Sequence, residues 1–159
     1  MRLRTKLLAP FMMACLLPLQ AAAQSSPLGT DESYPDVEHE TPLSGAELRA
    51  AFTGKKHLGS YNFLSRDIPT YAFEETTKSD GGIRHVQQGK VDTGTWEITD
   101  NIICYDYDDP GLYQACFRMY VRGNCYYHYQ VSVEGYPKFG FSARSVIAGE
   151  TPSCEPSLV

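Results

Sequence analysis

Residues 94–107, GTWEITDNIICYDY, and residues 115–133, ACFRMYVRGNCYYHYQVSV, decide the fold of this chain. Both stretches are rich in aromatic and β-branched residues, which suit the pleated, half-buried surface of a strand. Turn-forming residues interrupt them at 100–101, at 108–111 and at 122–124. The pattern predicts consecutive antiparallel strands joined by short hairpins.

The first two hairpins predict which side chains lie opposite each other. A two-residue turn at 100–101 places Trp96 opposite Tyr105, and a hairpin symmetric about Pro110 then places Tyr105 opposite Ala115. The same register places Cys104 opposite Cys116 on the reverse face.

A third hairpin, centred on Asn124, places Met119 opposite Tyr129. Because side chains alternate along a strand, a slip of one residue would turn half of the apolar set toward water. We expect one apolar face, formed by Trp96, Ile98, Ile103, Tyr105, Phe117, Met119, Val121, Tyr127, Tyr129 and Val131.

The cysteines predict two disulfides. Cross-strand neighbours such as Cys104 and Cys116 lie within disulfide reach, and Cys125 lies in a turn from which it can bind Cys154 in the C-terminal tail. Of the five cysteines, Cys15 lies in the predicted signal peptide, so four remain in the mature chain. An even number in an exported chain favours disulfides over metal or redox chemistry, and no pair has C-x-x-C spacing.

The N-terminus has the pattern of a signal peptide over residues 1–23. Three basic residues precede a mostly apolar stretch from Leu7 to Leu19, and Ala21-Ala22-Ala23 offers small residues for cleavage. The apolar stretch is too short, and too interrupted by proline, for a membrane span. Cys15 leaves open processing as a lipoprotein, although the apolar run continues beyond it.

The remaining chain is divided into a leader and one domain. Residues 24–40 are rich in Ser, Pro, Asp and Glu and predict a disordered leader, whereas residues 41–159 predict a single domain. Ser44 and Glu47 form a capping box, and Gly54 marks the end of the short helix that follows it. The predicted fold is α+β and mainly β: an antiparallel meander or partial barrel of about seven or eight strands with one short N-terminal helix. The expected strands are 57–63, 70–77, 83–88, 94–99, 102–107, 115–121, 126–133 and 138–146.

The charge of the chain argues against a nucleic-acid partner. The full sequence has 14 basic and 19 acidic residues. Cleavage after Ala23 removes three of the 14 basic residues, so the mature chain has 11 against 19 and a formal charge of −8. Binding to phosphates needs a basic face, which this composition does not supply.

No motif predicts a catalytic, cofactor-binding or metal-binding site. Asp92-Thr93-Gly94 matches the active-site tripeptide of aspartic proteases, but those enzymes need two such aspartates and the chain has one copy. His39, His57, His85 and His128 lack the spacing of metal ligands. We therefore expect a protein that is not an enzyme.

Several short motifs resemble a known group. The chain carries LSGAEL (43–48), FTG (52–54), DTGTWEI (92–98), ICY (103–105) and CF (116–117). In this it resembles small uncharacterised secreted proteins of alphaproteobacteria, in which an S-G-x-E-L helix precedes a G-x-W-x-I…C…C-F meander. The resemblance implies a bacterial envelope location and a β-sheet or partial barrel, and it implies no activity.

These observations leave three classes of function open. The first is a periplasmic or secreted binding module that docks an envelope protein through an outward face containing Arg118, Tyr120, Tyr126 and His128. The second is a carrier of a small ligand with a lipocalin-like cavity. The third is a hydrolase or other enzyme without a recognisable motif.

Overall fold

The computed structural model describes residues 40–62, 71–110, 114–155 and 158. The predicted signal peptide, and the predicted leader except for Glu40, lie outside these residues. The elements are α1 (Gly45–Phe52), β1 (Lys55–Tyr61), β2 (Ala72–Thr77), β3 (Gly82–Gln87), β4 (Lys90–Thr99), β5 (Ile102–Tyr107), β6 (Ala115–Arg122), β7 (Cys125–Val131) and β8 (Pro137–Ile147).

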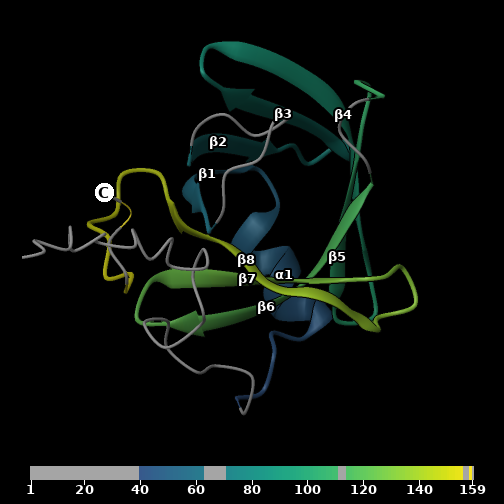
Figure 1. Cartoon of the computed structure of the whole chain (residues 1–159), viewed down its shortest axis with the longest axis vertical. Coiled ribbons are helices and arrows are strands. Elements are labelled where there is room, and N and C mark those ends of the chain that lie inside the picture. Colours follow the sequence, from purple (N-terminus) through teal and green to yellow (C-terminus); the bar gives the residue numbers. More distant parts are fainter. Residues whose placement is uncertain (1–39, 63–70, 111–113, 156–157, 159) are drawn as a thin grey trace, which may run out of the picture.

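The eight strands form a closed antiparallel barrel in which each strand pairs with the next along the chain (Figure 1). Pairing of β8 with β1, from Ile147 opposite His57 to Ala143 opposite Tyr61, closes the sheet. Closure gives every strand two neighbours and leaves no free edge for another chain to extend. The predicted mainly β fold with one short N-terminal helix is confirmed.

Helix α1 begins at the predicted capping box. The Ser44 side chain accepts from the backbone N–H of Glu47, and the Glu47 carboxylate accepts from the backbone N–H of Ser44 at 2.8 Å. The backbone N–H of Gly45 donates to Asn101 Oδ1 at 2.9 Å, which ties the start of the helix to the turn between β4 and β5. A side chain at Gly45 would lie 2.2 Å from the carbonyl oxygen of Asp100, so this close approach requires glycine.

The buried face of α1 closes one end of the barrel. Leu48 and Phe52 are fully buried and pack against the inward side chains Ile83, Ile103 and Met119. The last carbonyls of a helix lack partners within it. Here two inward side chains act as partners: Thr77 donates to the carbonyl of Phe52, and His57 donates to the carbonyl of Ala51.

The predicted register is confirmed from β4 to β6. Trp96 lies opposite Tyr105, and Tyr105 lies opposite Ala115. Trp96 contacts the inner core but stays partly exposed, and its indole N–H donates to the carbonyl of Lys78 at 2.8 Å.

The predicted register between β6 and β7 is wrong by one residue. The turn consists of Gly123 and Asn124 alone, because Arg122 pairs with Cys125. Gly123 has a φ of 59°, the left-handed conformation that the first position of a type II′ hairpin turn requires. Met119 therefore lies opposite His128 and not opposite Tyr129. The slip places Tyr127, Tyr129 and Val131 on the outer face of the barrel.

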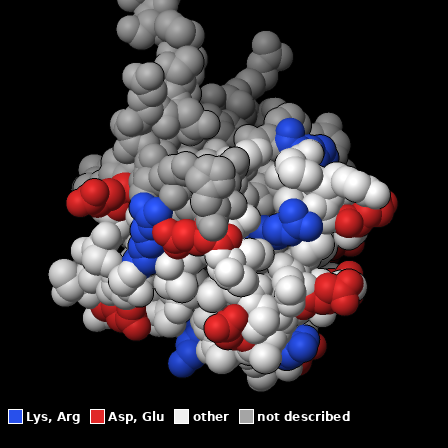
Figure 2. Space-filling model, turned by 90° about the horizontal axis from the view of Figure 1, so that it is seen from below, with Lys and Arg blue, Asp and Glu red and all other residues white. Residues whose placement is uncertain are grey.

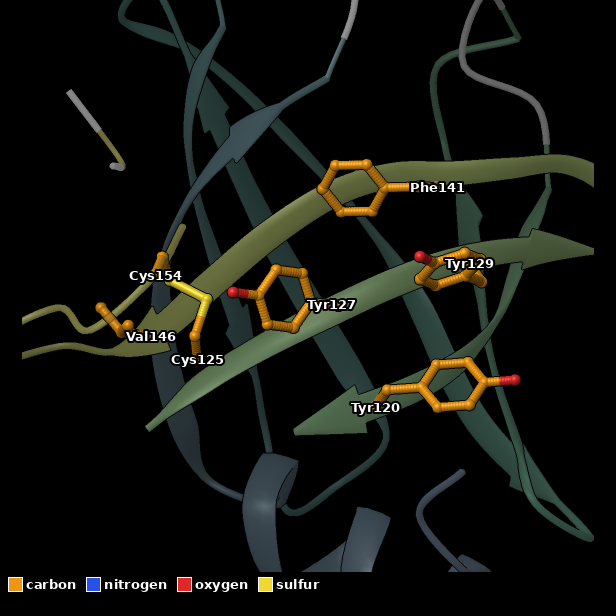
Figure 3. Packing of buried hydrophobic residues seen from close by; sticks show 7 residues of the cluster. All are labelled: Tyr120, Cys125, Tyr127, Tyr129, Phe141, Val146 and Cys154. Carbon is orange, nitrogen blue, oxygen red and sulfur yellow. A yellow bond between two sulfur atoms is a disulfide. The ribbon is translucent and has the colours of Figure 1, made fainter. Parts of the chain in front are cut away.

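The outer face of β6, β7 and β8 carries a second apolar cluster, shown in Figure 3. Tyr127 is buried and its hydroxyl exchanges hydrogen bonds with the backbone of Glu155, at 3.2 Å as donor and 3.1 Å as acceptor. The Cys125–Cys154 disulfide holds the C-terminal tail against this cluster. The other predicted disulfide, Cys104–Cys116, is also present and joins β5 to β6. Two disulfides fit an oxidising compartment outside the cytoplasm.

Candidate functional site

A row of four ionisable side chains crosses the inner face of the barrel from β1 to β4. Strand register places Glu75 between His57 and His85, and His85 beside Asp92. Glu75 has 6% relative exposure, His57 and His85 have less, and Asp92 is half-buried. Side chains of this kind are rarely so buried unless they are paired or serve a site. The row makes the barrel interior the candidate functional site.

Glu75 is the centre of a hydrogen-bonded cluster. Its Oε2 atom lies 2.8 Å from His85 Nδ1 and accepts from the Tyr107 hydroxyl at 3.0 Å. The Tyr61 hydroxyl lies 3.5 Å from His85 Nε2. These four residues, from β1, β2, β3 and β5, are named the Glu75 cluster below.

The protons of the Glu75 cluster can be assigned from its geometry. A carboxylate oxygen accepts, so His85 donates to Glu75 from Nδ1; in the tautomer that carries its proton on Nδ1, Nε2 accepts from the Tyr61 hydroxyl. Burial, and secondly the negative charge of Glu75, raise the pKa of Tyr61 and that of Tyr107. The phenols of Tyr61 and Tyr107 therefore remain protonated at neutral pH. Their O–H groups are directed at His85 and Glu75 respectively, within the cluster.

Two carboxylate oxygens in this row have no hydrogen-bond partner among the described residues. They are Oε1 of Glu75 and Oδ2 of Asp92, and both atoms are buried. The other oxygen of Asp92 accepts from the backbone N–H of Thr93 at 2.9 Å. An unsatisfied buried polar group costs about 1–3 kcal/mol, and more when it is charged. The row therefore has unused capacity to accept hydrogen bonds from a donor.

Aromatic rings surround the Glu75 cluster. Phe73 stacks on His85 with ring centroids 5.8 Å apart, and Tyr61 lies 4.6 Å from Phe73. Tyr105 lies beside Tyr107, 6.3 Å between centroids. Gly59 makes room for Phe73, because a Cβ atom there would lie 2.1 Å from the ring. The walls of the site are thus apolar rings, and its polar atoms are concentrated at the carboxylates.

A second network lies nearer α1 and contains two more buried histidines. Ser145 Oγ lies 3.1 Å from His57 Nδ1 and 2.8 Å from His128 Nε2. His57 donates from Nε2 to the carbonyl of Ala51, so its Nδ1 accepts from the Ser145 hydroxyl. Ser145 in turn accepts from His128 Nε2, and the chain of donors runs from His128 through Ser145 and His57 to α1. These three side chains are named the Ser145 bridge below.

Burial keeps both histidines of the Ser145 bridge neutral. It lowers the pKa of His57 to about 4, although the hydrogen bond to Ala51 acts in the opposite direction. Burial, together with the charge that His57 can carry, lowers the pKa of His128 to about 3. Ser145 has no exposed surface, so this hydroxyl is not accessible to a substrate.

The four residues predicted to share an outward face do not share one. Arg118 and Tyr120 lie on the outer side of β6, whereas Tyr126 and His128 point into the barrel, because the turn at Gly123 is one residue shorter than expected. His128 is 5% exposed and contacts Phe52 and Phe117, so the prediction that it lies on an outward face is wrong. Tyr120 is itself buried in the outer cluster (Figure 3).

The outer surface carries shallow clefts. One of about 660 Å³ lies over β3, β4 and β5. Its lining includes Asp80, Trp96, Glu97, Asp106 and Gln114. Figure 2 shows one face of the molecule, on which basic and acidic side chains are interspersed. That face offers no uniform charge for a highly charged partner.

Within residues 40–62, 71–110, 114–155 and 158, no group of three or more His, Cys, Asp and Glu side chains could hold a metal ion. In the same residues, no helix has the length and apolar character needed to cross a membrane. Comparison of the chain with family models, with curated proteins and with solved structures finds no match.

The sequence interpretation missed the polar interior. It considered the histidines as possible metal ligands, placed His128 on an outward face, and did not consider Glu75. A signal was present in β2 and β3, where Phe73, Glu75 and Thr77 alternate with polar residues, as do Ile83 and His85. In a half-exposed sheet such strands have no clear inner face, but in a closed barrel one set must point inward.

Proposed function

We propose that this protein binds a small ligand outside the cytoplasm, and that the Glu75 cluster is its binding site. The observation that carries the proposal is the buried Oε1 atom of Glu75, which has no partner among the described residues although His85 and Tyr107 both bind the other oxygen. Binding sites combine apolar walls with a few polar groups that fix orientation. The rings of Phe73 and Tyr105 beside this carboxylate fit that description.

The packing of the barrel limits the size of the ligand. The half of the interior next to α1 is filled by Leu48, Phe52, Ile83, Ile103 and Met119, all nearly or fully buried. A large lipocalin-like cavity would need this space. The ligand is therefore small, and it occupies the half of the barrel around Glu75.

The residues around Glu75 differ in their exposure to solvent. Tyr61, Asp92 and Tyr107 are half-buried, whereas Glu75 and His85 beneath them are almost fully buried. We infer that the ligand enters past Tyr61 and Tyr107 and not past α1. The four residues of the Glu75 cluster include no serine or cysteine nucleophile, so binding without chemistry is the function that its groups support best.

Native mass spectrometry of protein exported to the periplasm of a bacterial host tests this proposal. We expect a fraction of the chain to carry an added mass that is lost on denaturation. Glu75→Gln should reduce that fraction, and Glu74→Gln should not, because Glu74 lies on the outer face and binds Lys56. A chain that shows only its own mass, even after incubation with an extract of small molecules from the same cells, would contradict the proposal.

A further inference from the structure

The Glu75 cluster offers a ligand acceptors and no donors from its ionisable groups. His85 directs one nitrogen at Glu75 and, as an acceptor, the other at Tyr61, and Tyr107 directs its proton at Glu75. What remains toward a ligand is Oε1 of Glu75 and the lone pairs of the Tyr107 oxygen. A ligand at this position must therefore donate hydrogen bonds.

The charge around the cluster is negative. Glu75 and Asp92 flank His85 on the inner face, and each has a buried oxygen without a partner among the described residues. Lys90 lies on the same side of β4, but its ammonium group is bound to Asp109 and its side chain is 69% exposed. Lys90, the basic residue nearest in sequence to Asp92, is thus paired with Asp109 and does not neutralise the carboxylates of Glu75 and Asp92.

The aromatic walls also favour a cation. Phe73, Tyr105 and Tyr107 surround the carboxylate, and the faces of such rings attract an ammonium group placed within about 6 Å of their centroids. An anionic ligand would meet the carboxylates of Glu75 and Asp92, which would repel it. A neutral alcohol could donate one hydrogen bond but would leave the charge of Glu75 without compensation.

We propose that the ligand of the Glu75 cluster is a small protonated amine, whose N–H groups bind Oε1 of Glu75 while Asp92 supplies a second negative charge. This inference rests on the proposed function and specifies the chemical class of its ligand. The amine binds the Glu75 oxygen that has no partner among the described residues, and the rings of Phe73 and Tyr107 hold its apolar part.

A set of matched probes tests the inference. Propylamine, 1-propanol and propionate have nearly the same size and carry a positive, a neutral and a negative head, and tetramethylammonium carries the positive charge without an N–H group. Chemical-shift titration of the full mature chain at pH 7.5 and constant salt gives a dissociation constant for each. We expect propylamine to bind at least tenfold more tightly than each of the other three compounds.

Variants on the two faces of β2 identify the group responsible. Glu75→Gln keeps an oxygen for His85 and places an amide N–H₂ group where Oε1 was, so the preference for propylamine should fall at least tenfold. Glu74→Gln removes the same charge from the outer face of the strand and should leave the preference unchanged.

Three results would overturn the inference: equal or tighter binding of 1-propanol, propionate or tetramethylammonium, a preference for propylamine that survives Glu75→Gln, or no binding of propylamine at all. Its failure can be distinguished from failure of the proposed function. A neutral or anionic molecule found on the protein by native mass spectrometry would refute the proposal that the ligand is an amine and would support the proposed ligand-binding function.

Discussion

The two hydrogen-bonded networks inside the barrel use similar residue types and differ in whether they are complete. In the Ser145 bridge, His128 donates to Ser145, Ser145 to His57, and His57 to a carbonyl of α1. In the Glu75 cluster, two donors converge on one carboxylate oxygen and the other has no partner among the described residues. A polar group inside a barrel is thus structural where its hydrogen bonds form a complete chain, and a candidate for binding where one is left open.

The two networks also differ in how completely they are covered by other side chains. The Ser145 bridge lies under Phe52, whose ring stacks on His57 with centroids 4.3 Å apart. In the Glu75 cluster, Glu75 and His85 are almost fully buried, whereas Tyr61 and Tyr107 are half-buried. Helix α1 therefore seals the complete network, whereas the incomplete network includes two half-buried residues.

Removal of the Phe52 ring, which covers the Ser145 bridge, should have the largest effect on stability. Phe52→Ala deletes a fully buried ring that contacts His57, Tyr126 and His128, so we expect a loss of about 3–5 kcal/mol in the free energy of unfolding. Denaturant unfolding under oxidising conditions measures it. Arg49→Ala, at an exposed position of the same helix, should change the free energy by less than about 0.5 kcal/mol. Equal effects of the two substitutions would show that α1 does not seal the barrel.

Acid should destabilise the protein through the Ser145 bridge. The pKa of His57 is about 4 in the folded protein and near 6.5 when the chain is unfolded, so between these values the unfolded state binds more protons. The stability due to neutral His57 is complete above pH 6.5 and is lost as the pH falls toward 4. The difference between the folded and unfolded pKa values of His57 corresponds to about 3 kcal/mol in the free energy of unfolding.

Unfolding free energies at pH 7, 5.5 and 4 test this pH dependence. We expect His57→Gln to reduce the slope of stability against pH in this interval, because glutamine does not titrate. A slope that is the same in the wild type and in the variant would mean that His57 does not remain neutral when the barrel is folded.

Loss of the central hydroxyl should cost less than loss of the ring. Ser145→Ala leaves Nδ1 of His57 without a donor and Nε2 of His128 without an acceptor, both in buried surroundings. We expect a loss of about 2–3 kcal/mol, from the usual cost of unsatisfied buried polar groups. Ser142 is also buried on β8, and its hydroxyl donates to the nearby carbonyl of Gly140, so Ser142→Ala is the matched control and should cost less. The reverse order would contradict the assigned bridge.

The sequence predicted what depends on local signals. The capping box at Ser44, the strands between 82 and 147, and the register of β4, β5 and β6 all follow from short-range patterns. The two disulfides were predicted from that register and from the C-terminal position of Cys154.

The interior site could not be predicted, because it depends on closure of the sheet and on one turn. β7 has aromatic residues at both parities, with Tyr126 on one side and Tyr127 and Tyr129 on the other, so alternation alone cannot decide its inner face. Only a two-residue turn at Gly123 brings His128 to Ser145. The pairing of Glu75 with His85 was accessible in principle from the hairpin between β2 and β3, but its importance appears only when both point into a closed barrel.

The most direct test of the contrast between the two networks is the free energy of unfolding of Glu75→Gln without ligand, measured beside Ser145→Ala. The carboxylate of Glu75 has a buried oxygen without a partner among the described residues. Glutamine keeps an oxygen that accepts from His85 and Tyr107 but removes the negative charge. We predict that Glu75→Gln changes stability by no more than about 1 kcal/mol, in the direction of greater stability, as is common when a binding group is replaced. A loss of more than about 2 kcal/mol, comparable to that of Ser145→Ala, would contradict the account, because it would show that the carboxylate of Glu75 stabilises the fold and is not held open for a ligand.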